Sequence, residues 1–320
     1  MSAGESRASE RVVVKIGGAR AVDPAGALGG VAELLDSESG YDAVLTHGGS
    51  TAVDETLERL GIDPEYVETP SGVVGRFTDR ETMEVFEMVL PGRLNTDLVA
   101  GLRSEGVDAV GLSGVDGGLL SGPRRSAVRV LEDGKRKIRR GDHSGSLRDV
   151  DGGLLETLLS SGYTPVVSPP MAGIENEDGE AVVTPVNVDA DRAAAAVAAE
   201  LDATLLLLTD VPGVLADPDD ETTLFGRVET PADWERLTAA AEGFMRRKLM
   251  AVEAALQNGT ARAIVADANA EQPVRSALDG GGTHIHASAL GHSNGDTESD
   301  NSEIATSDRT KHEQTGERDT

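Results

Sequence analysis

The sequence of 320 residues contains no cysteine and few aromatic residues. Without cysteine, disulfides and thiolate metal sites are excluded. Because aromatic residues make up only 2% of the chain, its core must be built mainly from Ala, Val and Leu. No apolar run approaches the ~20 residues that span a bilayer. The first ten residues, MSAGESRASE, lack the apolar segment of a secretory signal. These absences predict a soluble, cytoplasmic protein without a membrane partner.

Positive charge is also scarce in this chain. It has 56 Asp and Glu residues against 29 Lys and Arg residues, which gives a formal net charge of −27. Only five of the basic residues are lysines. A low lysine content with many acids is typical of proteins from salt-accumulating halophiles, whose acidic surface keeps them soluble. Since a net anion is repelled by phosphate groups, nucleic acid is not expected as a partner.

Short apolar runs that end in glycine-rich loops alternate with helical patterns along the chain. The runs are rich in Val, Leu and Ile and are predicted as buried strands, at residues 11–18, 42–49, 108–118, 164–170, 204–214 and 261–267. The helical patterns between them lie at residues 50–61, 82–106, 189–203 and 246–259. This alternation predicts an α/β fold in which a mainly parallel sheet is covered by helices on both faces.

Two stretches interrupt the alternation and are predicted as hairpins at the edge of a lobe, at residues 121–150 and 176–188. The first is unusually basic, with five Lys and Arg residues between Lys135 and Arg140. Residues 1–10 are expected to be a flexible N-terminus. Residues 287–320 have almost no large apolar side chains, so we expect a disordered, acidic tail there.

Two predicted strands end in glycine pairs that could approach an anion. The first ends in Lys15, Ile16, Gly17 and Gly18, and the second in His47, Gly48 and Gly49. Glycine pairs let backbone N–H groups come close to a phosphate, although tight turns need glycine equally often. The lysine sharpens this reading, since a lysine at the end of a buried strand is unfavourable unless it meets a negative charge. The spacing matches neither a P-loop nor a dinucleotide fingerprint.

Three further motifs lie in the second half of the chain. Asn187, Asp189 and Asp191 precede or open an Ala-rich helical pattern, where acids also serve as N-caps. An apolar strand ends in Thr209 and Asp210, followed by a Pro-Gly turn that contains Gly213, which suggests a nucleotide-binding loop. Lys248 is expected at a helix start, where a cation opposes the helix dipole unless an external anion compensates it. A solvated lysine is the alternative.

In this order, the motifs resemble those of the amino acid kinase superfamily over about residues 11–286, and most closely the acetylglutamate-kinase-like enzymes. The resemblance implies a three-layer αβα sandwich with a substrate-binding lobe at residues 11–180 and an ATP-binding lobe at residues 181–286. It also implies a homodimer, as is usual in the family. One departure is Phe244, at a position where glycine commonly precedes the methionine.

The resemblance also implies the roles of individual residues. Lys15 and Lys248 would flank the transferring phosphoryl group, and Asp191 would hold both lysines. ATP and Mg²⁺ are the implied cofactors, and the metal would be held by the ATP phosphates rather than by the protein. His47 is then expected to be a positioning residue or a bystander rather than a proton acceptor, because an ionised carboxylate nucleophile needs no general base. The residues implied to contact ATP or its phosphates are Gly17, Gly18, Thr209, Asp210 and Gly213, and Gly48 and Gly49 are implied on the substrate side.

The acceptor is predicted from residues 69–99, TPSGVVGRFTDRETMEVFEMVLPGRLNTDLV. Arg76 matches the arginine that grips the substrate α-carboxylate, and Asn187 matches its partner across the cleft. The sequence of this segment resembles that of one branch of these kinases. The branch acts in arginine and lysine biosynthesis on glutamate or aminoadipate attached to an acidic amino-group carrier protein. The carrier is expected to contact the basic hairpin, at Arg136, Lys137, Arg139 and Arg140. The alternatives are a kinase of free N-acetylglutamate, a non-catalytic amino-acid-binding regulator on the same fold and, for the hairpin, a merely solvated surface.

Overall fold

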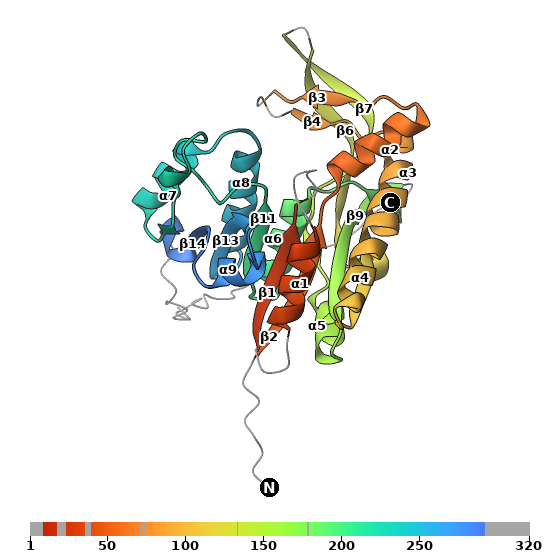
Figure 1. Ribbon diagram of the computed structural model, residues 1–320. Coiled ribbons are helices and arrows are strands. Elements are labelled where there is room, and N and C mark those ends of the chain that lie inside the picture. The colour runs from red at the N-terminus through yellow and green to blue at the C-terminus, as the bar shows by residue number, and fades with distance from the viewer. Residues whose placement is uncertain are drawn as a thin grey trace, which may run out of the picture.

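The computed structural model describes residues 9–17, 24–35, 40–70, 72, 74–132, 134–177 and 179–291. One large sheet continues through two lobes. A long hairpin projects from the top of the lobe that contains α2, α3 and α4 in the view of Figure 1. Along the chain, the strands are β1 (Glu10–Ile16), β2 (Tyr41–His47), β3 (Tyr66–Glu68), β4 (Val74–Arg76), β5 (Ala109–Gly114), β6 (Leu120–Glu132), β7 (Lys135–Gly145), β8 (Asp149–Val150), β9 (Thr164–Glu177), β10 (Glu180–Val186), β11 (Thr204–Thr209), β12 (Arg227–Val228), β13 (Arg262–Asp267) and β14 (Thr283–His286).

The order of strands in the large sheet is β12-β14-β13-β11-β1-β2-β9-β6-β7, with β5 and β10 also paired to β9 and β8 paired to β6. The central pairs β13–β11, β11–β1, β1–β2 and β2–β9 are all parallel. Antiparallel pairs lie toward the edges, in β13–β14, β9–β10 and β6–β7. The mainly parallel α/β architecture predicted from the alternation is thus confirmed.

Helices cover both faces of this sheet. They are α1 (Pro24–Leu34), α2 (Ser50–Leu60), α3 (Arg80–Glu87), the π-helix η1 (Met88–Leu94), α4 (Asn95–Ser104), the 3₁₀ helix η2 (Asp116–Gly118), α5 (Gly152–Ser160), α6 (Ala190–Glu200), the 3₁₀ helix η3 (Glu221–Thr223), α7 (Pro231–Ala240), α8 (Gly243–Gln257), α9 (Pro273–Leu278) and the 3₁₀ helix η4 (Ala287–Leu290). Helix α1 has no counterpart among the predicted helices, because its three glycines weaken the helical signal. Gly30 lets α1 lie close to α9, since a Cβ at this position would lie 3.2 Å from Val274.

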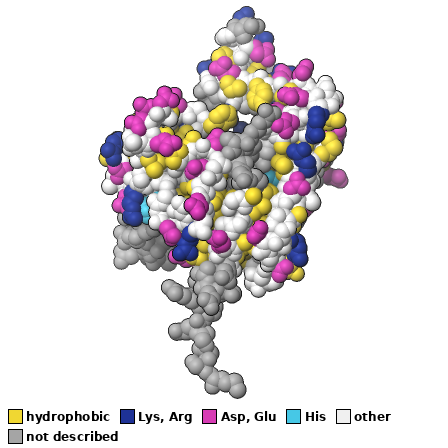
Figure 2. Space-filling view, in the orientation of Figure 1, with side chains coloured by type: hydrophobic (Ala, Val, Ile, Leu, Met, Phe, Trp, Pro, Cys, Tyr) yellow, Lys and Arg dark blue, Asp and Glu magenta, His cyan; other side chains and the backbone are white. Residues whose placement is uncertain are grey.

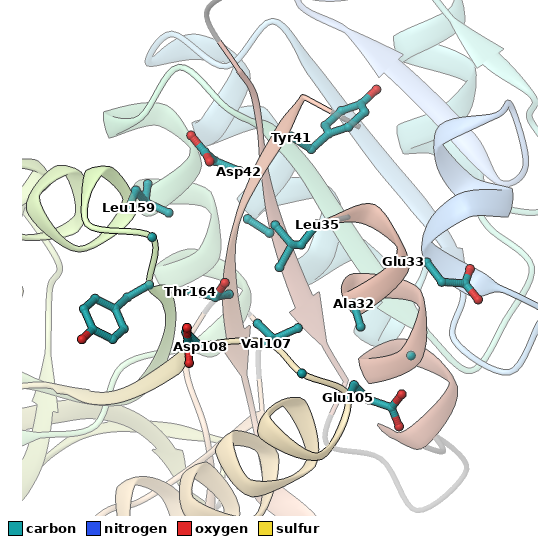
Figure 3. A pocket seen from close by; sticks show the side chains of 15 residues that line it. Ala32, Glu33, Leu35, Tyr41, Asp42, Glu105, Val107, Asp108, Leu159 and Thr164 are labelled. Carbon is teal, nitrogen blue, oxygen red and sulfur yellow. The ribbon is translucent and has the colours of Figure 1, made fainter. Parts of the chain in front are cut away.

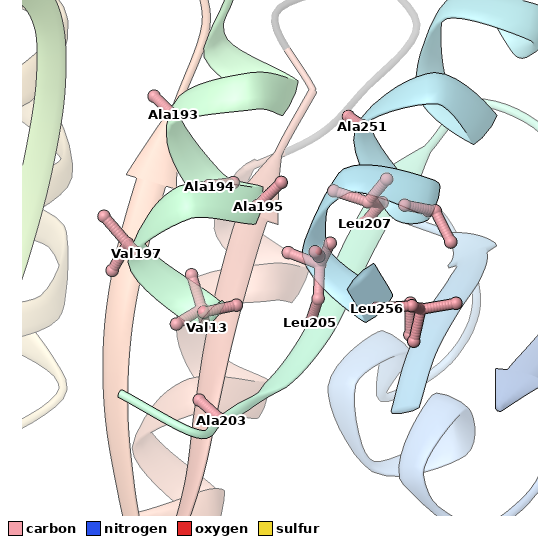
Figure 4. Close-up of a cluster of buried hydrophobic side chains, with 14 of the residues drawn as sticks. Val13, Ala193, Ala194, Ala195, Val197, Ala203, Leu205, Leu207, Ala251 and Leu256 are labelled. Carbon is pink, nitrogen blue, oxygen red and sulfur yellow. The ribbon is translucent and has the colours of Figure 1, made fainter. Parts of the chain in front are cut away.

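The core is divided in two by the alternation of side chains along each strand. Val12 of β1 and Leu206 of β11 belong to the cluster beneath α1, α4 and α9. Val13, Leu205 and Leu207 belong to the opposite cluster, beneath α6 and α8 (Figure 4). The small alanine side chains of α6 let that helix lie close to the sheet, and they are buried there. An odd-numbered residue at the end of β1 therefore points toward α6.

Residues 80–104 form a continuous helical path in which α3 passes through η1 into α4. Pro91 lies inside η1 and cannot donate a backbone hydrogen bond, and widening of the helix at this point accommodates it. Leu90 and Leu94 of η1 pack so closely on Gly49 that a Cβ there would lie 2.6 Å and 2.4 Å from their methyl carbons. The π-helix thus packs directly against the loop that follows β2.

Both predicted edge hairpins are present, as β6–β7 and β9–β10. The predicted start of the disordered tail at residue 287 is wrong by at least five residues. Ala287–Leu290 form η4, and Ala287 and Ala289 are buried in the core cluster beneath α6 and α8. Small side chains packed under α7 hold this segment, although it has few large apolar residues. Residues 292–320 and 1–8 lie outside the described part of the chain.

Candidate functional site

The residues predicted to carry chemistry meet at the carboxyl edge of the parallel strands. Lys15 of β1 is in register with Thr46 of β2 and with Leu207 of β11. Because parallel strands end at the same edge of a sheet, the loops after β1, β2 and β11 lie side by side. Open α/β sheets bind their ligands at this edge.

A buried triad of charges lies at this edge, formed by Lys15, Asp191 and Lys248. Lys15 Nζ is 2.7 Å from Asp191 Oδ1, and Lys248 Nζ is 3.1 Å from Asp191 Oδ2. Lys15 points toward α6, as its position after Val13 requires, and Asp191 lies in the first turn of that helix. The exposed fractions of the three side chains are 7%, 13% and 12%. The structure thus brings together three residues that are far apart in the sequence.

The triad carries one positive charge in excess. Burial alone would raise the pKa of Asp191, but the Lys15 and Lys248 ammonium groups outweigh it and hold that pKa below its usual range. Burial, reinforced by the Lys15 charge, lowers the pKa of Lys248, and Asp191 opposes this shift. A desolvated site with two ammonium groups and one carboxylate attracts a further anion.

Lys248 lies deeper in its helix than predicted. Helix α8 begins at Gly243, so Lys248 is its sixth residue rather than a residue of the helix start. Since the influence of the helix dipole falls off within the first turn, the dipole argument is wrong. The contact with Asp191 explains the position of Lys248 instead. Asp189 is the N-cap of α6, as its alternative reading predicted, and accepts from Arg192 N at 3.0 Å.

The glycine loops differ from the expectation that their N–H groups face a phosphate. Gly17 N donates to Leu208 O at 3.1 Å, and Gly48 N donates to Ile16 O at 3.4 Å. In this structure, both N–H groups are therefore engaged within the sheet. Gly49 heads α2, whose N-terminus has no side-chain cap, so the helix presents backbone donors at the edge of the sheet. Gly18 lies outside the described residues.

His47 is buried and neutral. Burial lowers its pKa to about 4, with the Lys15 charge acting in the same direction and a hydrogen bond to Gly48 opposing it. Nδ1 lies 3.1 Å from Gly48 O and Nε2 lies 3.2 Å from Asn95 Nδ2, so Nδ1 carries the proton and Nε2 accepts. Asn95 also donates to Val166 O at 2.9 Å. The imidazole thus joins β2 to α4 and β9, which suits a positioning residue.

The loop after β11 is held in a tight turn. Thr209 Oγ1 donates to Asp210 Oδ1 at 3.1 Å, and Thr209 O accepts from Ala268 N at 2.7 Å. Gly213 has φ 155°, and a Cβ there would lie 2.7 Å from both Leu224 and Thr283. Close packing thus requires glycine at this turn.

Arg76 lies in a pocket of polar and aromatic side chains that the sequence did not indicate. It forms an ion pair with Asp54 of α2, and its Nη2 donates to Ser50 Oγ at 2.9 Å and Tyr66 Oη at 3.1 Å. Its guanidinium carbon lies 5.2 Å and 5.5 Å from the ring centres of Tyr66 and Phe86. In the sequence, Asp54 looks like any solvated acid of an amphipathic helix, and only the fold brings it to Arg76.

Asn187 lies beside the segment that follows Arg76. Its Nδ2 donates to Thr78 Oγ1 at 3.3 Å. Its backbone N donates to His143 O at 2.8 Å, and its O accepts from Gly145 N at 2.9 Å. These contacts tie the segment that leads into α6 to the end of β7.

The basic hairpin has two different faces. On the inward face, Arg139 forms an ion pair with Glu65 and stacks 4.4 Å above the ring of Phe77, and Lys137 Nζ lies 2.7 Å from Glu132. Two of the four predicted carrier contacts thus have partners within the chain. The outward face is formed by residues opposite one another in the ladder, namely Ala127, Arg129, Leu131, Arg136, Ile138 and Arg140. We call these six residues the outward face.

On the outward face, three exposed arginines surround an isoleucine. Arg129, Arg136 and Arg140 are exposed, and Ile138 is 66% exposed. In Figure 2, the hairpin is the projecting tip at the top, and Asp and Glu side chains are scattered over the rest of the visible face. This concentration of arginine around an apolar side chain contrasts with the net charge of the molecule.

Helix α8 also reaches the β3–β4 hairpin. Arg247 Nη2 donates to Val74 O of β4 at 2.9 Å, and its guanidinium carbon lies 5.1 Å from the ring centre of Phe244. Phe244, the departure noted in the sequence, is 78% exposed. The helix that carries Lys248 is therefore in contact with the hairpin that carries Arg76.

A hollow of about 730 Å³ lies at the opposite end of the sheet (Figure 3). It is lined by Tyr41 and Asp42 at the start of β2, with Thr164 at the start of β9 nearby. Tyr41 and His47 are the first and last of the seven residues of β2, roughly 20 Å apart along an extended strand. The hollow is therefore separate from the charged site.

Two features are absent from the described residues, a membrane-spanning helix and a cluster of metal-binding side chains. No helix there is both long and apolar enough to span a membrane. Within the same residues, no group of three or more His, Asp or Glu side chains is arranged to hold a metal ion.

Comparison with known proteins gives a consistent result. The profile described as "Amino acid kinase family" matches residues 10–267. The [LysW]-aminoadipate kinase of Deinococcus radiodurans is 43% identical over 276 residues, covering 86% of this chain and 91% of the relative. An acetylglutamate kinase of Methanopyrus kandleri is 44% identical over 76% of this chain and 91% of its own length. The [LysW]-aminoadipate/[LysW]-glutamate kinase of Metallosphaera sedula is 34% identical over 86% and 99%.

A solved structure is similar in fold. It is the N-acetylglutamate synthase from Neisseria gonorrhoeae complexed with coenzyme A and N-acetyl-glutamate. The TM-score is 0.64 at 24% identity, covering 87% of this chain and 59% of that chain. At this identity, the similarity concerns the fold alone.

Proposed function

Because the chain belongs to the amino acid kinase family, we propose that it transfers the γ-phosphoryl group of ATP to a side-chain carboxylate of an acceptor attached to a carrier protein. The acceptor is glutamate or 2-aminoadipate, and the carrier is the acidic amino-group carrier protein, LysW in the names of the relatives. The observation that carries the reaction type is the Lys15–Asp191–Lys248 triad at the carboxyl edge of the sheet. The product is an acyl phosphate in lysine or arginine biosynthesis.

In the reaction, an oxygen of the acceptor carboxylate attacks the γ-phosphorus, and the bond from that phosphorus to the β–γ bridging oxygen breaks. A carboxylate with an ordinary pKa is already ionised at pH 7 and needs no base. Lys15 and Lys248 neutralise the negative charge that two anions bring together, and Asp191 fixes both ammonium groups. His47 keeps its proton on Nδ1 throughout, because both ring nitrogens are engaged.

ATP is proposed to lie over the loops after β1 and β11, in contact with Gly17, Gly18, Thr209, Asp210 and Gly213. Gly48, Gly49 and the N-terminus of α2 would face the acceptor side of the transferring group. Mg²⁺ held by the ATP phosphates would add positive charge beside the transferring group.

Arg76 and Asn187 are proposed to bind the α-carboxylate of the acceptor. An arginine fork suits a carboxylate, and Arg76 is already oriented by Asp54, Ser50 and Tyr66. In the absence of acceptor, Asp54 balances the charge of Arg76.

The carrier is proposed to dock on the outward face of the β6–β7 hairpin. Of the four hairpin contacts predicted from the sequence, Arg136 and Arg140 lie on this face, and Arg129 joins them. In molar salt the Debye length is about 3 Å, so only contact pairs such as arginine forks on carboxylates retain much of their strength. Arg139 instead anchors the hairpin to Glu65 and Phe77, and Lys137 pairs with Glu132 within the hairpin. We also propose that the enzyme is a homodimer.

The acceptor is tested by mixing the purified protein and ATP with carrier-linked glutamate, carrier-linked aminoadipate or free N-acetylglutamate. We expect turnover of a carrier-linked acceptor. Turnover of N-acetylglutamate alone would establish the activity named for the Methanopyrus relative. An absence of turnover with all three, together with binding of an amino acid, would favour a regulator.

The docking surface is tested by changing Arg136 and Arg140 to Glu together. The KM for the carrier-linked acceptor should rise while the KM for ATP stays the same. The charge-matched control changes Arg227 and Arg236 to Glu, two exposed arginines of the ATP-binding lobe. If both double variants have the same acceptor KM as the unchanged protein, the hairpin is only a solvated surface.

A further inference from the structure

The segment that follows Arg76 is fastened to the end of β7. Thr78 is fully buried, and its backbone N donates to Asp142 Oδ1 at 3.2 Å. Its backbone O accepts from His143 N at 2.6 Å. One residue earlier, Phe77 lies under the guanidinium group of Arg139. The strand β7 thus holds this segment at three successive points.

Asn187 is fastened to the same strand end. Its backbone N and O pair with His143 and Gly145, and its side-chain Nδ2 donates to Thr78 Oγ1 at 3.3 Å. Arg76 and Asn187 come from segments more than a hundred residues apart in the sequence. Their relative position therefore depends on Thr78 and on the two residues of β7 that hold it.

Asp142 is the charged member of this arrangement and has no part in the reaction described above. The residue is only 4% exposed. Its carboxylate accepts from Thr78 N and also from the hydroxyl group of Ser144. A buried carboxylate is unfavourable unless its hydrogen bonds are strong, and hydrogen bonds to an ionised acceptor are about twice as strong as neutral ones. A carboxylate at this place thus favours a rigidly held Thr78.

We propose that Asp142 is a positioning residue for the acceptor: it fixes Thr78, and through Thr78 it sets Arg76 and Asn187 at the separation that grips the acceptor α-carboxylate. The inference rests on the proposed function, in which Arg76 and Asn187 bind that carboxylate. In addition to Asp142 and Arg139, β7 carries Arg136 and Arg140, which lie on the outward face. The strand on which the carrier is proposed to dock is therefore the strand that sets the acceptor pocket.

The test measures the KM for acceptor, the KM for ATP and kcat, using whichever acceptor the unchanged enzyme phosphorylates. In Asp142→Ala, the acceptor KM should rise about tenfold, as expected for the loss of one charge-assisted hydrogen bond. The KM for ATP should not change, because the triad and the loop after β11 are untouched. In Asp142→Asn, an amide oxygen can still accept from Thr78 N, so most of the loss should be restored.

A second variant keeps the inference testable if Asp142→Ala does not fold. Thr78→Val keeps the backbone contacts and the shape of the side chain but removes the oxygen that accepts from Asn187. It should raise the acceptor KM and spare the KM for ATP. The matched control is Thr260→Val, since Thr260 is also fully buried and its hydroxyl has no hydrogen-bond partner among the described residues.

Two results would overturn the inference. One is an acceptor KM in Thr78→Val, and in folded Asp142→Ala, equal to that of Thr260→Val. The other is a parallel change of both KM values with a lower melting temperature, which would indicate a purely structural role. A failure of the proposed function shows differently, because the unchanged enzyme would then use none of the acceptors.

Discussion

At the scale of single residues, the site depends on how three buried charges are shared. Asp191 contacts two ammonium groups with its two oxygens, so neither lysine is left unpaired in the absence of ATP. The remaining positive charge is available to a phosphoryl group. Removing one lysine would leave Asp191 balanced by the other, which predicts a loss of charge stabilisation without a loss of fold.

Lys248→Ala should lower kcat by at least about a hundredfold, as expected when one group that stabilises transition-state charge is removed. The melting temperature should change little, since Lys15 still compensates Asp191. The measurement is steady-state turnover alongside thermal unfolding. Arg246→Ala is the control, because Arg246 is an exposed cation two residues earlier in α8. Unchanged turnover in Lys248→Ala would rule out the assigned role.

His47 should make the protein sensitive to acid. Its folded pKa of about 4 lies below the unfolded value of about 6.5, so below pH 6.5 the unfolded chain takes up a proton that the folded protein does not. Stability from this residue is complete above pH 6.5 and falls as the pH decreases, by about 3 kcal/mol at pH 4. Denaturant unfolding at pH 7 and pH 4 should show a steeper loss for the unchanged protein than for His47→Asn. Equal losses would contradict a buried, neutral His47.

At the scale of elements, the β6–β7 hairpin combines an anchor and an exposed surface. Successive side chains of β7 lie on opposite faces of the hairpin. Lys137 and Arg139 therefore lie on one face, and Arg136, Ile138 and Arg140 lie on the other, the outward face. The sequence shows only a run of basic residues. Whether each one is structural or available to a partner follows from the position of Glu65 and Phe77, more than sixty residues away.

Arg139 and Lys137 should differ in their contribution to the free energy of unfolding. Arg139→Ala loses a forked ion pair and an aromatic contact, so we expect the free energy of unfolding to fall by about 1–2 kcal/mol. Lys137→Ala loses an exposed pair, worth less than about 1 kcal/mol. Denaturant titration of both variants checks this order. A larger effect for Lys137→Ala would show that the hairpin is anchored elsewhere.

At the scale of the whole molecule, two lobes share one sheet, and α8 connects them. Lys248 on this helix belongs to the triad, while Arg247 contacts the hairpin that carries Arg76. The acidic surface acts on the entire fold, because mutual repulsion in a chain with a net charge of −27 favours expansion.

Added salt should therefore stabilise the protein. The Debye length, beyond which exposed charges are largely screened, is about 10 Å at 0.1 M salt and about 3 Å at 1 M. Because stronger screening weakens the repulsion between acidic residues, the melting temperature should rise between low and molar KCl. For a chain of this size, each kcal/mol gained at the transition raises it by about 2–4 °C. Calorimetry over a KCl series checks this, with sucrose at matched concentrations as an uncharged control. A melting temperature that falls with KCl would show that attractive pairs dominate.

Local patterns in the sequence were sufficient to predict the elements that contain strong periodicity. The strands at residues 11–18 and 204–214 and the Ala-rich helix after Asp189 are found where their apolar patterns place them. Helix α1 was missed because its three glycines weaken its local signal. The start of α8 was also misjudged, since Gly243 and exposed Phe244 do not resemble a helix start.

The order of motifs along the chain determined the family, the reaction type and the residues that meet at the triad, because chemistry of this kind needs particular side chains at strand ends. Only the tertiary structure decided which groups surround them. Asp54 beside Arg76, Asp142 beneath Thr78 and Glu65 beneath Arg139 are acids like many others in an acidic sequence. Their roles come from contacts between distant segments, which no local pattern records.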